Sequence, residues 1–198
     1  MGVMVAAALG CATALSAAAG AQTLEATRYS PPTNMVDGEL VLALPAALTT
    51  GLSAGVGASY LRPFGGRGTF ALGARASWST ATEYSLVDAV RNDDIRMRIC
   101  GLVQHVAGRG SFGLRLGLGA TAVYESRTRE QGSRAGLSGN ALETTAWYLF
   151  PAADLDGVVF LRVWDAWGMS LSGGPTVHLI DGSARMGWGT SLGVSWQP

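Results

Sequence analysis

The sequence predicts an all-β fold in which eight antiparallel strands close into an up-and-down barrel. The first observation is a period of two, because successive residues of a strand point to opposite faces. In the closing stretch "ARMGWGTSLGVSWQP", one face carries Met, Trp, Thr, Leu, Val and Trp, and the other carries Arg, Gly, Gly, Ser, Gly and Ser. The second observation is composition. The 198 residues include 28 Gly and only 14% charged residues, against about 25% in soluble domains.

The chain begins with an apolar, alanine-rich stretch that is typical of a secretory signal peptide. A small-x-small pattern predicts cleavage after Ala21, and the alternative is a lipoprotein signal that ends at Cys11. After cleavage at Ala21 only Cys100 remains, so no internal disulfide is expected. The following segment contains a Pro-Pro break and predicts an irregular leader. The predicted organisation is a signal peptide, a leader and a barrel, at residues 1–21, 22–37 and 38–198.

The barrel segment is a series of alternating stretches with no competing helical period. Short turns follow the second, fourth and sixth stretches, and polar segments at 84–94 and 127–141 follow the third and fifth. The sixth stretch is too long for one clean membrane crossing, and Pro151 predicts a bulge that shifts its register. The eight predicted strands cover about residues 38–48, 52–62, 69–83, 95–107, 112–126, 142–163, 169–179 and 185–196.

A face of large apolar residues opposite a face of Gly and Ser fits two environments, a soluble barrel or sandwich and a membrane barrel. Glycine on a water-facing strand weakens the strand and packs nothing. Inside a barrel of eight strands the space is narrow, and small residues leave room for inward-pointing side chains. The strand register directs a set of charges into that lumen, with Asp154 or Asp156 as further partners. The predicted lumen charge network is Arg75, Arg96, Arg98, Arg115, Arg185, Glu39 and Glu125.

Large aromatic residues lie near the strand ends, at two levels. Phe70 and Trp78 are eight residues apart, which corresponds to roughly 20 Å of height in a tilted strand, close to the apolar band of outer-membrane barrels. This spacing favours the membrane barrel over the soluble alternative. The predicted aromatic girdles contain Tyr60, Phe70, Trp78, Phe112, Tyr124, Trp188 and Trp196.

With this strand pattern, these girdles and the final "SLGVSWQP", residues 38–198 resemble the small eight-stranded outer-membrane β-barrels of bacteria, of the OmpA and OmpX type. The resemblance implies export to the outer membrane of a Gram-negative bacterium. It also implies contact with outer-membrane lipid and lipopolysaccharide, and insertion by the barrel-assembly machinery. Members of this group usually end in an aromatic residue, whereas here Gln197 and Pro198 follow Trp196.

Residues that could carry out chemistry are few. Some members of the group that the chain resembles are lipid-modifying enzymes with a His, a Ser and an acid near the outer rim, and His178, Asp181 and Ser183 could be arranged in that way. No spacing fixes a nucleophile against a base, and a rim histidine beside a polar loop is the simpler interpretation. No metal or cofactor site is predicted, because the two His and Cys100 are far apart in the sequence. A net charge of zero gives no indication of nucleic-acid binding.

The sequence therefore predicts a non-enzymatic integral barrel with a structural or surface-interaction role. Its lumen is expected to be closed by Arg/Glu pairs and small residues. The alternatives are a porin-like narrow pore for small solutes and a lipid-modifying enzyme of the outer rim. The oligomeric state stays open.

Overall fold

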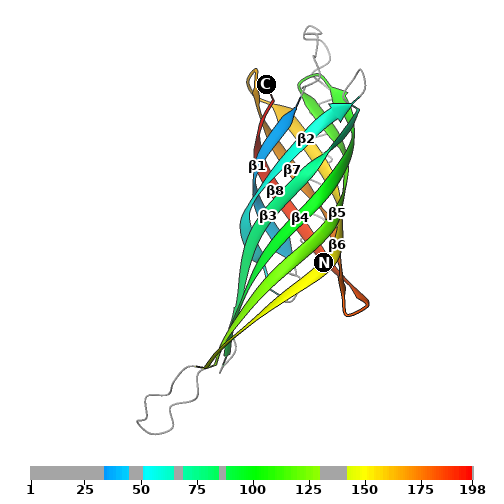
Figure 1. The fold of residues 1–198 in the computed structure, drawn as a ribbon. Helices are drawn as coiled ribbons and strands as arrows, with labels where there is room; N and C mark the ends of the chain where they lie inside the picture. Colours follow the sequence, from blue (N-terminus) through cyan, green and yellow to red (C-terminus); the bar gives the residue numbers. More distant parts are fainter. Residues whose placement is uncertain (1–33, 45–50, 65–68, 85–87, 130–141, 198) are drawn as a thin grey trace, which may run out of the picture.

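The computed structural model describes residues 34–44, 51–64, 69–84, 88–129 and 142–197 of the chain (Figure 1). Eight antiparallel strands form one closed barrel, in which each strand pairs with the next and β8 pairs with β1. The predicted fold class, an eight-stranded up-and-down barrel, is therefore confirmed. The strands are β1 Met35–Leu44, β2 Ser53–Phe64, β3 Phe70–Tyr84, β4 Asp88–Ala107, β5 Gly110–Arg129, β6 Leu142–Arg162, β7 Trp167–Ile180 and β8 Ser183–Trp196.

The alternation of side chains along each strand separates an apolar exterior from a polar interior. On β1, Asp37 and Glu39 are buried, whereas Leu40 is 63% exposed. Ile99 on β4 and Leu114 on β5 are 74% and 60% exposed. A soluble barrel would bury these side chains, because apolar surface is driven out of water. An apolar outside and a polar inside are the arrangement of a transmembrane β-barrel.

Glycine on the inner face lets neighbouring strands approach closely. A Cβ atom added to Gly174 on β7 would lie 1.9 Å from the carbonyl oxygen of Leu155 on β6. No side chain fits at that distance, so the contact between these two strands depends on the missing Cβ. Gly189 on β8 differs, because the nearest atom to an added Cβ is the Oγ1 of Thr176, at 3.9 Å.

The strands differ in length at one end of the barrel. The short turns after β4 and β6 lie at what we call the inner end, which is uppermost in Figure 1, and the Asp181-Gly182 hairpin turn lies at the opposite, outer end. β4 begins at Asp88 and β5 continues to Arg129, so part of the segments predicted as loops is strand. The residues beyond the rest of the barrel, which we call the outer extension, are 81–84, 88–92, 125–129 and 142–151.

The predicted bulge at Pro151 is wrong. The pairing of β5 with β6 keeps one register from Gly110↔Leu161 to Arg129↔Leu142. Pro151 lies just outside the ladder between β6 and β7, which begins at Ala152, so its missing N–H breaks no bond to β7. β6 is long because it continues into the outer extension.

The connection between β7 and β8 is a tight hairpin turn. Asp181 and Gly182 both have positive φ, 50° and 76°, as the two-residue turn of a β-hairpin requires.

β1 begins at Met35, inside the segment predicted as a leader, while the predicted signal peptide and residues 130–141 lie outside the described residues. The described part of the chain contains no helix that could cross a membrane.

Candidate functional site: the filled lumen

The interior of the barrel holds a group of ionisable side chains, which we call the inner charged layer. Its members are Asp37, Glu39, Arg75, Arg115 and Asp156, from strands β1, β3, β5 and β6. Arg115 Nη2 lies 2.9 Å from Asp156 Oδ2, and its Nη1 lies 3.5 Å from Glu39 Oε1. Arg75 pairs with both of the same carboxylates. Two arginines thus share two acids.

Serine hydroxyls from the remaining side of the barrel complete this layer. Arg115 Nη2 donates a hydrogen bond to Ser172 Oγ at 3.0 Å, and Ser172 Oγ lies 2.7 Å from Ser191 Oγ. Both serines are buried. The layer therefore links β1, β3, β5, β6, β7 and β8 across the lumen, and each ion pair is supported by further hydrogen bonds, as buried charges require.

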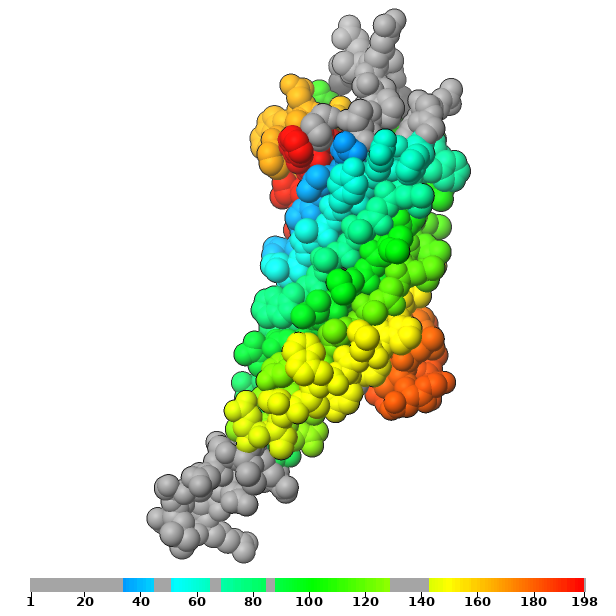
Figure 2. All heavy atoms as spheres, in the orientation of Figure 1, coloured from blue at the N-terminus to red at the C-terminus, as the bar shows by residue number. Residues whose placement is uncertain are grey.

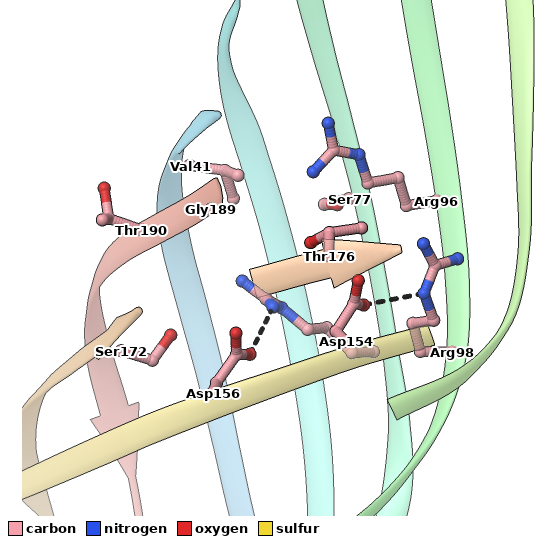
Figure 3. Close-up of a pocket in the computed structure, with 11 residues that line it drawn as sticks. Val41, Ser77, Arg96, Arg98, Asp154, Asp156, Ser172, Thr176, Gly189 and Thr190 are labelled. Atoms are coloured by element: carbon pink, nitrogen blue, oxygen red, sulfur yellow. Dashed lines mark hydrogen bonds and ion pairs between the residues drawn. The ribbon is translucent and has the colours of Figure 1, made fainter. Parts of the chain in front are cut away.

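A second group, the outer charged layer, consists of Asp94, Arg96, Arg98, Thr121 and Asp154. Arg98 Nε lies 2.7 Å from Asp154 Oδ2, as Figure 3 shows, and its Nη2 donates to Thr121 Oγ1 at 3.0 Å. Arg96 Nη2 lies 3.3 Å from Asp94 Oδ2 on its own strand. The two arginines and two acids of this layer balance in charge.

Apolar clusters lie on both sides of the charged layers. Apolar residues are rare at inward positions of a membrane barrel with an aqueous channel, where the lumen is polar. These two clusters were not predicted from the sequence. The alternation along the strands places Leu102 and Phe160 on the inward face near strand ends, and this could have indicated the inner plug. The inner plug is Met35, Leu61, Ala71, Cys100, Leu102, Val158 and Phe160, and the outer cluster is Val123, Phe150 and Ile180.

Two small cavities lie among these side chains. One cavity of about 20 Å³ lies between the charged layers, against Arg75, Arg96 and Asp154. A second, of about 10 Å³, lies between the inner charged layer and the inner plug. Each has room for about one water molecule. Through the described residues, the lumen is a packed and ion-paired core.

The predicted lumen network meets the structure in part. Arg75, Arg96, Arg98, Arg115 and Glu39 all lie buried or nearly buried in the two charged layers. Arg185 does not join them, because it is exposed on β8 near the Asp181-Gly182 turn. Glu125 does not join them either, and it pairs with Arg127 at 3.7 Å in the outer extension. Both occupy the inward positions of the strand alternation, as predicted, but they lie nearer the outer end than the two charged layers.

The structure also corrects the expectation that His178 lies at the outer rim beside Asp181 and Ser183. His178 is 2% exposed, whereas Asp181 and Ser183 are exposed residues of the hairpin between β7 and β8. The three side chains are therefore not assembled into one site. Instead, His178 lies opposite Ala152 in the ladder, among the polar groups of the outer half of the lumen.

The predicted girdle residues all lie on the outward face of their strands. Tyr60 OH donates to Asn34 Oδ1 at 2.8 Å, and the rings of Tyr124 and Trp147 lie 4.9 Å apart. Tyr124 is partly covered by this contact. The other six, Tyr60, Phe70, Trp78, Phe112, Trp188 and Trp196, are 42–58% exposed.

The closed barrel, its apolar exterior and its ion-paired interior define the class of eight-stranded transmembrane β-barrels. Comparison with solved structures finds Neisserial surface protein A, with 8% identity, a TM-score of 0.49, and coverage of 83% of this chain and 96% of that one. Ail of Yersinia pestis shows 9% identity, a TM-score of 0.47, and coverage of 82% and 96%. The N-terminal barrel of Pseudomonas aeruginosa OprF shows 10% identity, a TM-score of 0.42, and coverage of 83% and 98%. No protein-family model and no curated protein matches the chain.

Proposed function

We propose that the chain is an integral barrel of the bacterial outer membrane with a structural or surface-interaction role and no catalytic activity. One observation carries the proposal: the exterior is apolar while the buried interior is ion-paired. A closed barrel satisfies every backbone hydrogen bond within the hydrocarbon layer. Its partners are then outer-membrane lipid and lipopolysaccharide around the barrel, and the barrel-assembly machinery during insertion.

The filled lumen favours a closed barrel over a narrow pore. A conducting pathway needs a continuous aqueous path, whereas the two cavities described in the lumen have volumes of about 20 and 10 Å³. Opening a path would separate the pair Arg98–Asp154, at 2.7 Å, and the shared pairs of Arg115. Separation of buried ion pairs is costly.

Two measurements test this proposal. Membrane fractionation with heat-modifiable gel migration is expected to place the full chain in the outer membrane, as a folded form that unfolds only on boiling. In planar bilayers, the refolded protein is expected to give no steady conductance. A soluble, heat-insensitive protein would contradict the membrane assignment, and steady unitary currents would support the pore instead.

A surface role is supported by the outer extension. Residues 142–151 of β6 pair with β5 and, among the described strands, with no second neighbour. Such an edge presents free N–H and C=O groups to which an extended segment of a partner can add. In the space-filling view, this part of β6 (yellow) lies on the outer surface beside the β7–β8 hairpin (Figure 2).

The edge can be tested with two neighbouring proline substitutions. The N–H groups of Thr144 and Thr145 point to opposite sides of β6, because the direction alternates along a strand. One substitution therefore removes an edge donor and the other removes a bond to β5. If the edge binds partners, the variant that loses the edge donor and keeps heat-modifiable folding is expected to show reduced adherence. Adherence is measured with cells that display the barrel, on protein-coated surfaces. Unchanged adherence in both folded variants would count against a role for this edge.

A further inference from the structure

One buried carboxyl in the lumen forms no ion pair with any of the described residues. Asp37 is 3% exposed and lies on the inward face of β1, next to the inner plug. Its Oδ2 accepts a hydrogen bond from Ser59 Oγ at 3.2 Å, while its Oδ1 makes no hydrogen bond. Among the described residues, no arginine, lysine or histidine nitrogen forms an ion pair with it, in contrast to Glu39 and Asp156.

The inner charged layer therefore contains one more carboxyl group than guanidinium groups. Three carboxyl groups, Asp37, Glu39 and Asp156, face two guanidinium groups, Arg75 and Arg115. With every carboxyl ionised, the layer would carry a formal charge of −1. This charge would lie inside the lumen next to the apolar inner plug, where an uncompensated charge is strongly disfavoured.

The groups that face Asp37 do not remove this imbalance. Glu39 on the same strand is a second acid, and β2 and β8 contribute the hydroxyls of Ser59 and Ser195. Arg75 on β3 and Arg115 on β5 are the basic groups that act on Asp37, and both already pair with Glu39 and Asp156. Among the described residues, Arg162 is a further inward basic group near the inner end. It follows Phe160 on β6, lies on the rim side of the plug and makes a contact of its own.

We propose that Asp37 is a proton-binding site, which holds one proton in the folded barrel at mildly acidic pH and so balances the inner charged layer. The proton on Oδ1 converts an unpartnered acceptor into a donor. Ser195 lies directly opposite Asp37 in the β1–β8 ladder, is fully buried, and has an unpartnered hydroxyl oxygen. Directly opposed Cβ atoms lie about 5 Å apart, so the Ser195 hydroxyl is within reach as the acceptor.

A proton held by the folded state alone makes stability depend on pH in a defined direction. In the unfolded chain Asp37 is ionised above about pH 4. Unfolding then releases one proton, so the unfolding equilibrium constant rises up to tenfold per pH unit until the folded barrel also loses the proton. Asp37 therefore stabilises the barrel less as the pH rises, which is the opposite of a carboxylate paired with arginine.

The test compares the wild type with Asp37→Asn, an isosteric neutral variant, by urea unfolding of the refolded full chain in lipid vesicles from pH 5 to pH 9. We expect the ratio of wild-type to variant unfolding constants to rise with pH, by at least tenfold across the range. Ser195→Ala is expected to move this rise to lower pH. A ratio that is independent of pH would overturn the proposal.

A direct measurement keeps the proposal testable if Asp37→Asn fails to fold. Infrared spectra of the wild-type barrel at pH 5 are expected to contain the carbonyl band of a protonated carboxylic acid, which ¹³C-labelled aspartate would shift. Absence of this band would overturn the proposal. Dependence of folding on the concentration of NaCl, with no acid band, would identify a sodium ion as the balancing charge and would also contradict it.

Discussion

Arg115 is the side chain on which the inner charged layer most depends, and its replacement by methionine gives a quantitative test. Its side chain is 4% exposed, pairs with Asp156 at 2.9 Å and with Glu39 at 3.5 Å, and also donates to Ser172. Removal of one partner from a buried ion pair costs about 3–5 kcal/mol, because the other charge stays buried. Arg75 still contacts both acids, so the lower end of that range is expected, about 3 kcal/mol. This corresponds to roughly a hundredfold change in the unfolding constant.

The assay is equilibrium unfolding by urea in lipid vesicles, with Arg91→Met as the matched control. Arg91 pairs with Asp93 at 3.2 Å, but its side chain is 57% exposed, and exposed pairs contribute about 0–1 kcal/mol. A double variant, Arg115→Met with Asp156→Leu, is expected to recover part of the loss, because it removes the charge that Arg115 left behind. If Arg115→Met and Arg91→Met lose the same stability, the lumen is hydrated and the reasoning is wrong.

Two further predictions concern the wall of the barrel. Leu116 faces outward and is 50% exposed, so Leu116→Arg is expected to lower the free energy of unfolding by about 2–4 kcal/mol if it lies near the membrane midplane. A lipid-soluble label is expected to react with a cysteine at residue 116 and not with one at residue 117. Equal labelling would contradict the membrane assignment. Gly174→Ala places a Cβ 1.9 Å from a backbone oxygen and should destabilise the barrel by about 1–3 kcal/mol or more. Gly189→Ala should be nearly neutral in the same urea assay. Equal effects of the two substitutions would show that the close approach of β6 and β7 is not required.

Much of the wall could be predicted from the sequence, because parity along a strand is a local property. Residues two apart share a face whatever the rest of the chain does. The outward position of Leu116 and Trp188 and the inward position of Arg75 and Arg115 follow from this rule alone. The closed sheet of eight strands follows from the number of alternating segments and the short turns between them.

Only the tertiary structure decided which charges meet. The height of an inward residue depends on strand tilt, stagger and length, which closure of the barrel couples together. For this reason Glu125 and Arg185 have the predicted parity but lie outside the charged layers, while Asp154 and Asp156 pair with arginines from β3, β4 and β5. The same closure leaves Asp37 without an ion pair among the described residues. No spacing in the sequence could indicate this, because its neighbours come from strands far apart in the chain.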